Sequence, residues 1–378
     1  MRSPEETRHK LAEAVLHIRS GQATSRKTLA DLMSLSPTTA GFYVDHLIES
    51  GLLKESGLEQ GKMGRPKRTL STVAEAGWFA GIEFNADRIQ IAQVAFSGEV
   101  LTAESSPLPP EADAREVMSR ITTTLATLNR RTGHPLLGIG VGAPGVVDPI
   151  QGLALDYAFI SGWTQIPIQH RLQKRFQVPV TVENNLRTIA LAERWFGAGK
   201  QMDDYVILGP RSGFGIAIVN QGKLLRGRHY AAGEIGRWPW QTGEQKGEVH
   251  DAMTAPAVWR RLSGMSQRSR LPEDLRKALL NLDARSSPAW SAVIHDYAQV
   301  IGQLHFILDA EAYFLHGPLT ALGSAFCQSI SDQACLLMPS LKPIPPQVLP
   351  SELGDEAGAL GAASLAMEAW SPMLTPSA

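Results

Sequence analysis

A polar triplet, Glu183-Asn184-Asn185, stands between a predicted buried strand (VTVEN) and a predicted helix (LRTIALAERW). Side chains at such a junction often bind ligands or take part in catalysis. A carboxamide donates and accepts hydrogen bonds but cannot act as a general base near neutral pH. The two asparagines are therefore suited to binding a ligand through hydrogen bonds and not to accepting a proton. Asn185 is equally suited to capping the helix that follows, so both roles stay open for it.

Length and composition set the class of protein. The chain has 378 residues, of which 43% are hydrophobic and 19% charged, as in a folded soluble protein with two or three domains. Its only cysteines, Cys327 and Cys335, exclude a disulfide framework and a thiolate-rich zinc site. The sequence has no long apolar run and no signal-peptide pattern, so we expect a cytoplasmic protein without a membrane partner.

Three helical patterns open the chain. The first covers residues 4–19, the second begins after Thr24 or Ser25 as N-cap, and the third runs from Ser36-Pro37 to Gly51. Their spacing predicts a helix-turn-helix. Two short strands near residues 52–54 and 69–71 then enclose a basic, glycine-bearing loop, which is typical of a wing.

The charge of this segment suits nucleic acid. Residues 1–70 carry 11 Lys and Arg against 8 Asp and Glu, a net charge of +3, whereas the whole chain has 36 against 37. We therefore predict a winged helix-turn-helix DNA-binding domain over residues 1–75, in preference to a small helical bundle with a solvated basic loop. The predicted DNA contacts are Arg26, Ser36, Thr38, Thr39, Tyr43, Lys62, Arg65, Lys67 and Arg68.

Residues 76–378 alternate between strand and helix patterns in two rounds. Apolar strands such as LLGIGVGAP and DDYVILGP are followed by glycine turns and amphipathic helices, and the small-residue helix GDEAGALGAASLAMEAW closes the chain. This repetition predicts an α/β domain of two similar lobes with a cleft between them.

The motifs of this second part carry a resemblance to a known family. GIGVGAPGVVD, SGW at Ser161 to Trp163, VENN with ALAE, SGFGIAIV with QGKLLRG, and AAGEIG follow the order and spacing of the ROK family (repressors, open reading frames and kinases). Together with the N-terminal segment, the chain resembles the sugar-responsive transcriptional regulators of that family. The resemblance implies an actin/hexokinase-like two-lobed fold that binds a sugar and dimerises.

Three family features of a sugar kinase are altered. The phosphate-binding turn D-x-G-G-T-K is replaced by Glu83-Phe84-Asn85-Ala86-Asp87-Arg88, which lacks both glycines. Asn185 stands where the family has the aspartate that acts as general base. The adenosine-side G-G-G run is reduced to His316-Gly317-Pro318, and the second phosphate loop survives only as residues 212–215. We therefore expect no kinase activity and no ATP cofactor.

The resemblance also implies a set of sugar contacts. They are Gly145, Asn184, Asn185, Glu234, Arg237 and His250. For Glu234 binding is favoured over a bracing role. Arg237 occupies a family histidine position, and we expect it to brace Glu234 rather than to recognise an anionic ligand. His250 falls near a sugar-contacting glutamate of the family, although an ordinary surface histidine is the favoured alternative.

The family's zinc loop is also missing. The segment after Arg237 contains no cysteine, so we expect no metal site. Trp238 and Trp240 are expected to pack that loop rather than stack on a sugar.

The resemblance implies that a sugar changes the angle between the lobes and that a homodimer, or a dimer of dimers, transmits the change to double-stranded operator DNA. Leu304, Ile307, Leu308 and the closing helix are candidates for a dimer interface or for core. The alternative functions are a sugar kinase with divergent motifs and a DNA-bound regulator controlled by a protein partner.

Overall fold

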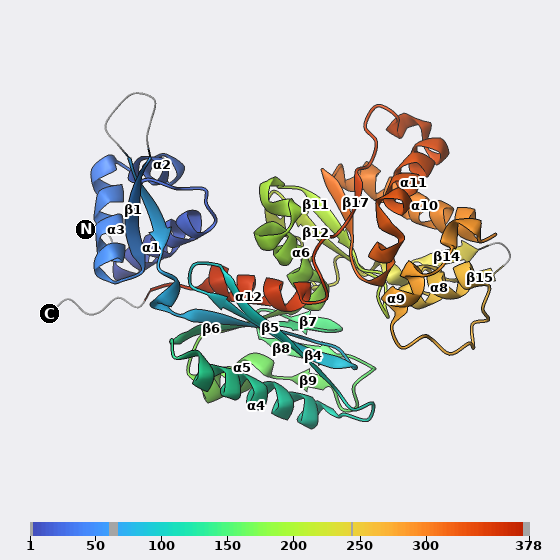
Figure 1. Ribbon diagram of the computed structural model, residues 1–378, viewed down its shortest axis with the longest axis horizontal. Coiled ribbons are helices and arrows are strands. Elements are labelled where there is room, and N and C mark those ends of the chain that lie inside the picture. Colours follow the sequence, from blue (N-terminus) through green and yellow to red (C-terminus); the bar gives the residue numbers. More distant parts are fainter. Residues whose placement is uncertain (1–2, 60–66, 243–244, 373–378) are drawn as a thin grey trace. The chain divides into compact units, whose positions relative to one another are not determined.

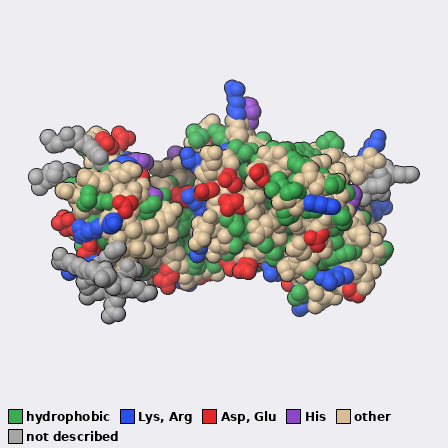
Figure 2. Space-filling view, turned by 90° about the horizontal axis from the view of Figure 1, so that it is seen from above, with side chains coloured by type: hydrophobic (Ala, Val, Ile, Leu, Met, Phe, Trp, Pro, Cys, Tyr) green, Lys and Arg blue, Asp and Glu red, His purple; other side chains and the backbone are tan. Residues whose placement is uncertain are grey.

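The structure is a computed structural model that describes residues 3–59, 67–242 and 245–372. The chain divides into two compact units, shown in Figure 1. The first contains the residues up to Thr188 together with those from Gly358, and the second contains Ile189–Ala357. Acidic and basic side chains are interspersed over the face that Figure 2 shows, in keeping with the net charge of −1.

The N-terminal segment contains three helices and an antiparallel strand pair, as the sequence predicted. They are α1 (Pro4–Arg19), α2 (Arg26–Leu32), α3 (Pro37–Glu49), β1 (Leu53–Glu59) and β2 (Lys67–Thr72). The helices begin where the side chains of Ser3, Ser25 and Ser36 accept a backbone N–H of the first turn.

A five-stranded sheet forms the centre of the first unit. The strands are β3 (Trp78–Phe84), β4 (Arg88–Ala95), β5 (Val100–Pro107), β6 (Leu136–Ala143) and β10 (Val180–Asn184). They lie in the order β10-β6-β3-β4-β5, in which β3, β4 and β5 form an antiparallel meander. Strands β6 and β10 add parallel to β3, so the ends of β3, β6 and β10 meet at one edge.

Helices cover both faces of this sheet (Figure 1). Buried residues of α4 (Ala114–Thr132) and α5 (Ile168–Phe176) pack on one face, and α12 (Ala357–Ala369) lies on the other. A Cβ on Gly140 of β6 would lie 1.7 Å from the carbonyl oxygen of Ala362, so glycine is needed for this close approach. The closing helix is therefore core, which was one of its two alternatives.

Smaller elements complete the first unit. A three-stranded sheet consists of β7 (Val146–Asp148), β8 (Leu153–Asp156) and β9 (Thr164–Ile166), and the 3-10 helix η1 spans Ala74–Ala76. Helix α6 (Asn185–Phe196) begins in the first unit directly after β10. The polar triplet thus lies at the junction that its sequence predicted.

The second unit repeats the strand order of the first. Its strands are β11 (Tyr205–Leu208), β12 (Ile216–Asn220), β13 (Lys223–Leu224), β16 (Ala312–Leu315) and β17 (Val348–Pro350). The order is β13-β12-β11-β16-β17, again an antiparallel meander followed by two parallel strands. The predicted repetition of strand patterns is confirmed.

Helices and a hairpin surround the second sheet. Their bounds are β14 (Pro239–Thr242), β15 (Gln245–Glu248), α7 (Val249–Met253), α8 (Ala255–Ser263), α9 (Leu275–Leu280), α10 (Trp290–Leu308), α11 (Gly323–Leu337) and the 3-10 helices η2 (Ala198–Gln201), η3 (Ile235–Arg237), η4 (Ala284–Ser286), η5 (Pro318–Leu322) and η6 (Pro339–Leu341). In the described part of the chain, no helix has the length and apolar character needed to cross a membrane.

Helix α10 carries three apolar residues that we predicted to lie either in a dimer interface or in the core. Leu304 is buried in the core of the second unit and Leu308 packs against that core, whereas the Ile307 side chain is 72% exposed. Leu304 and Leu308 therefore belong to the core, because they lie on the inner face of the helix.

Candidate functional site

The polar edge of the first sheet is set by strand register. Glu83 at the end of β3 pairs with Gly142 of β6, and Gly142 pairs in turn with Glu183 of β10. Both glutamates are buried, with exposed fractions of 1% and 0%. Two carboxylates from distant parts of the sequence are thereby brought to one edge, where charge must be compensated by hydrogen bonds or ion pairs.

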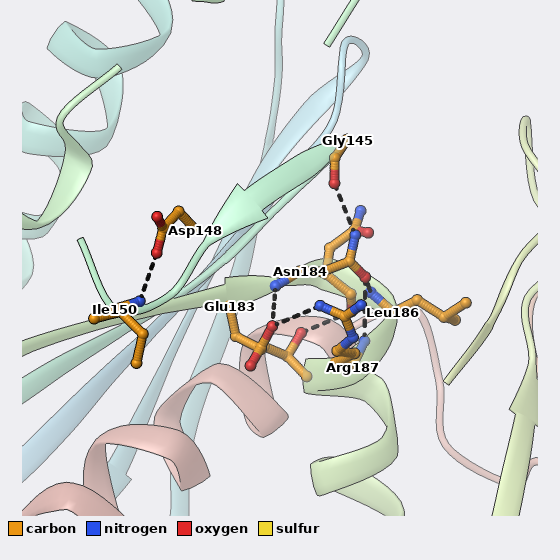
Figure 3. A network of polar contacts seen from close by, with 9 residues as sticks. Gly145, Asp148, Ile150, Glu183, Asn184, Leu186 and Arg187 are labelled. Carbon is orange, nitrogen blue, oxygen red and sulfur yellow. Dashed lines mark hydrogen bonds and ion pairs between the residues drawn. The ribbon is translucent and has the colours of Figure 1, made fainter. Parts of the chain in front are cut away.

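Glu183 is compensated by the first turn of α6. Its Oε1 atom lies 3.2 Å from Nη1 of Arg187, which is itself 3% exposed, and it also accepts the backbone N–H of Asn184 at 2.9 Å. Figure 3 shows these side chains converging at the junction of β10 and α6. This buried ion pair fixes the start of the helix and hence the position of both asparagines.

Asn184 holds the junction together. Its Nδ2 donates to the carbonyl oxygen of Gly145 at 3.0 Å, and its Oδ1 accepts the N–H of Leu186 at 2.9 Å (Figure 3). Asn184 therefore fills the capping role that the sequence offered to Asn185, because it is the last strand residue and reaches the first free amides of the helix. Asn184 and Gly145, which were both predicted to contact the sugar, are thus in direct contact with each other.

Asn185 makes a different contact. Its Nδ2 donates to Oε1 of Glu83 at 3.1 Å, and the side chain is 7% exposed. Its Oδ1 has no hydrogen-bond partner among the described residues. It is also not among the side-chain atoms of those residues that lack a partner and are at the same time shut off from solvent. The amide oxygen is thus available to a ligand hydroxyl group.

The turn between β3 and β4 is closed by the side chain of Asn85. Oδ1 of Asn85 accepts the backbone N–H groups of Asp87 and Arg88 at 2.8 and 2.9 Å, and the N–H of Asn85 donates to the Arg88 carbonyl at 3.1 Å. The resemblance of the motifs placed the family's first phosphate-binding turn at these residues. Backbone donors that could hold a phosphate are already engaged here.

In the second unit, the loop carrying Glu234 is anchored by close backbone packing. A Cβ on Gly233 would lie 1.9 Å from the carbonyl oxygen of Ile216, and one on Gly236 would lie 2.2 Å from that of Phe214. Only glycines fit these positions. The Glu234 side chain is exposed and makes no ion pair or hydrogen bond with the described residues, which leaves its carboxylate free to bind a ligand.

Arg237 does not brace Glu234, contrary to our expectation. Its guanidinium is 81% exposed and lies 3.4 Å from the carboxylate of Glu248. The reason is the hairpin β14–β15, which pairs Pro239 with Glu248 and so brings Glu248 beside Arg237. Trp238 and Trp240 pack against the core of the second unit, which confirms the expectation that they support the loop.

His250 is half-buried. It lines a cavity of about 670 Å³ within the second unit. Other lining residues are Ser212, Trp240, Lys246, Arg260 and Arg261. His250 lies in the first turn of α7.

The N-terminal candidates divide into exposed and buried groups. Ser36 caps α3 and hydrogen bonds Thr39, while Thr38 is exposed beside them. Tyr43 is only 2% exposed, so its predicted DNA contact is wrong. The helical period turns Tyr43 toward the core and leaves its neighbour Phe42 outside, at 62% exposure.

The basic candidates near the strand pair also have different roles. Arg26 donates to Glu55 at 2.7 Å and pairs with Asp45 at 2.7 Å, and these contacts raise the pKa of Arg26 and lower the pKa of both carboxyls. Arg26 thus links α2, α3 and β1. Arg68 also pairs with Glu55 but is 70% exposed. The calls on Lys62, Arg65 and the side chain of Lys67 lie outside the described residues.

Sequence reasoning did not find the partner of Asn185 or the closure of the β3–β4 turn. Glu83 and Asn185 are 102 positions apart, and only strand register brings them together. The turn had a local signal, because an asparagine followed by turn residues often accepts the amides two and three positions ahead. Among the described residues, no group of three or more His, Cys, Asp or Glu side chains is arranged to hold a metal ion.

Among proteins of known function, repressors are prominent relatives. The xylose repressor of Caldicellulosiruptor bescii is 29% identical over 215 residues, covering 56% of this chain and 54% of the repressor. The N-acetylglucosamine repressor of Shigella flexneri is 29% identical over 219 residues, covering 56% and 52%. A glucokinase of Halalkalibacterium halodurans is 31% identical over 166 residues, covering 42% and 49%. The matches span about half the length of these relatives.

Solved structures show the same fold. A ROK family transcriptional regulator, a homolog of the Escherichia coli MLC protein, superposes with a TM-score of 0.79 at 19% identity, covering 96% of this chain and 97% of that one. A ROK family glucokinase from Streptomyces griseus, in complex with glucose and AMPPNP, gives 0.63 at 24% identity, covering 77% and 99%. The ROK domain thus has the actin/hexokinase-like fold that its motifs implied. Residues 79–369 match the ROK family, and the chain therefore belongs to the ROK family.

Proposed function

We propose that this chain is a DNA-binding transcriptional repressor whose ROK domain binds a sugar or sugar derivative without phosphorylating it. The observation that carries the proposal is the structure of the first sheet edge. Asn185, which by the resemblance of the motifs stands where the family has its general base, is hydrogen bonded to the buried Glu83. The β3–β4 turn, where phosphate would bind, has its amides engaged by Asn85.

Each feature removes one group that phosphoryl transfer needs. Both leave in place groups that can hydrogen bond to the hydroxyls of a sugar. An amide in place of the aspartate cannot accept the proton of the attacking hydroxyl, and a turn with occupied amides cannot receive the transferred phosphate. Gly145, Asn185 and Glu234 are the sugar contacts we propose, and Asn184 positions the first two. Catalysis requires all components together, whereas binding requires only the donors and acceptors.

The N-terminal segment supports the DNA-binding half of the proposal. Its three helices and strand pair fit a winged helix-turn-helix in which α3 enters the major groove. Thr38 and Thr39 at the start of α3 and the exposed Arg68 on β2 are available for DNA. The names of the repressor relatives, which refer to xylose and to N-acetylglucosamine, suggest the class of effector.

The donor set near Arg237 does not fit the family's structural zinc. Glu248 faces Arg237, and the Asp251 carboxylate accepts the Glu248 backbone N–H at 2.9 Å. Without thiolates, these engaged carboxylates and His250 are a poor tetrahedral set. We propose a domain that needs neither zinc nor ATP and that acts as a homodimer, because a two-fold protein matches a two-fold operator.

The test combines DNA binding with an assay of turnover. Purified protein would be used to select duplexes from a random library, and binding of the selected duplex would be measured with D-xylose, D-glucose and N-acetyl-D-glucosamine. We expect at least one sugar to change the DNA affinity tenfold or more, and no sugar to be phosphorylated with ATP and Mg²⁺. Phosphorylation of any sugar by the wild type would overturn the proposal, and phosphorylation that survives Asn185→Ala would also show that the active site lies elsewhere. Selection without any enriched duplex would overturn its DNA-binding half.

A further inference from the structure

We propose that Glu83 fixes the orientation of the Asn185 amide, so that this residue presents its oxygen, and not its amino group, to the ligand. The inference rests on the proposed function and specifies the chemistry of one contact. A ligand group at this position must donate a hydrogen bond, as a hydroxyl does. Glu83 is thus a positioning residue that acts through Asn185.

The argument begins with the geometry of the pair. The Nδ2 of Asn185 lies 3.1 Å from Oε1 of Glu83, and both side chains are buried. The two ends of an amide are nearly equal in shape, so only hydrogen bonding decides which end faces which neighbour. An ionised carboxylate accepts hydrogen bonds and donates none. Flipping the amide would place two oxygens against each other in a buried site.

Packing prevents Glu83 from turning away. A Cβ on Gly358, at the start of α12, would lie 2.5 Å from the Cγ of Glu83, so the helix backbone lies directly against the glutamate. The other charged side chains at this edge are Glu183 on β10 and Arg187 on α6, which pair with each other at 3.2 Å. The hydrogen bond to Asn185 and the close contact with α12 together hold Glu83 in this orientation.

The free end of the amide then defines a specificity. Oδ1 of Asn185 accepts nothing from the described residues, so it can accept a hydrogen bond from a ligand hydroxyl. A site built to pair with a hydroxyl discriminates strongly against an analogue that cannot donate. A fluorine atom resembles a hydroxyl in size but has no proton to give. Deoxyfluoro sugars therefore probe the orientation of the amide.

The first test needs no ligand and measures thermal unfolding of the full chain between pH 5 and pH 8. Asn185→Asp places two carboxyls at hydrogen-bond distance, so the folded protein holds a proton that the unfolded chain releases near pH 4. A group that binds its proton more tightly in the folded state loses stability as the pH rises. We expect the variant to approach the wild type at pH 5 and to melt progressively lower toward pH 8.

Two further variants are the matched controls. Asn185→Ala removes the contact without adding charge, and its deficit should not change with pH. The double variant Glu83→Gln with Asn185→Asp exchanges donor and acceptor, so it should recover the pH-independent stability. If Asn185→Asp follows the wild type over the whole pH range, or if the double variant does not recover, Glu83 does not orient Asn185 and the inference fails.

The second test measures ligand specificity by calorimetry. The probes are D-xylose, D-glucose, N-acetyl-D-glucosamine and the monodeoxyfluoro analogues of whichever sugar binds. For the wild type, we expect one analogue to bind at least tenfold more weakly than its parent and to lose most of that penalty in Glu83→Gln, whose side chain permits either amide orientation.

The two tests separate the inference from the proposed function. If a sugar binds but every analogue binds as well as its parent, the orientation is wrong while the sensor proposal stands. If no sugar binds but the pH test behaves as expected, Glu83 orients Asn185 and the sugar proposal fails.

Discussion

The edge of the first sheet and the loop around Glu234 in the second unit both carry candidate sugar contacts, yet they are built in opposite ways. At the first edge, buried side chains satisfy one another, as in the pair of Glu183 and Arg187. In the second unit, backbone packing at Gly233 and Gly236 holds the loop, and the side chains of Glu234 and Arg237 are exposed.

The two regions therefore differ in whether the same side chains serve both the stability of the fold and the binding of a ligand. Polar groups at the first edge determine both the fold and the ligand contact, so substitutions there should change both. The exposed side chains of Glu234 and Arg237 contribute little to the fold, because water already solvates them. The second loop can therefore change its ligand contacts without loss of stability.

The largest effect on stability is expected from breaking the buried ion pair between Glu183 and Arg187. Arg187→Ala should lower the free energy of unfolding by about 3–5 kcal/mol, because it leaves Glu183 charged and buried without its partner. Urea denaturation of the full chain measures this. Arg187→Met combined with Glu183→Gln is the control, and most of the loss should be recovered when both charges are removed. A loss of less than about 1 kcal/mol in the single variant would mean that the first edge is not held by this pair.

Removal of the Asn184 side chain should have the next largest effect. Asn184→Ala loses the contact with Gly145 and the acceptor for the first free amides of α6, and should cost about 2 kcal/mol. Asn184→Asp keeps the acceptor and should cost less, which urea denaturation can resolve. Equal losses in the two variants would show that the helix cap is unimportant.

Opening the β3–β4 turn should have a smaller effect and sharpens the comparison with a kinase. Asn85→Ala should destabilise the chain by about 1 kcal/mol, because two backbone amides lose their acceptor. Asn85→Asp retains the acceptor and is the matched control. Neither variant should gain ATP-dependent sugar phosphorylation, since Asn185 still lacks a proton-accepting group. A coupled assay that detects turnover in Asn85→Ala would contradict this.

The smallest effect on stability is expected in the second loop. Arg237→Ala breaks an ion pair that is mostly exposed, and should change the free energy of unfolding by less than about 0.5 kcal/mol. The same substitution separates two ligand classes in calorimetry. Neutral sugars should bind equally well to the variant, whereas a selective loss of D-glucuronate or D-glucose 6-phosphate binding would show that Arg237 recognises an anion.

Local patterns in the sequence predicted most of the elements and the family. Ser36-Pro37 marked the start of α3 because a cap and an N1 proline act within one turn. The alternation of strands and helices predicted two α/β lobes, which appear as two sheets of equal strand order. These features depend on residues close together in the chain, so one sequence is enough to recognise them.

Only the tertiary structure decided which candidate residues stabilise the fold and which are left to contact a ligand. The triplet Glu183-Asn184-Asn185 did not show that Asn184 would cap the helix and that Asn185 would face Glu83, because Glu83 arrives through the register of β3 and β6. Tyr43 and Arg237 were misassigned for a similar reason, since burial and the pairing of β14 with β15 depend on distant contacts. The sequence alone determined which chemical groups are present, and long-range packing determined which of them are left free for a ligand.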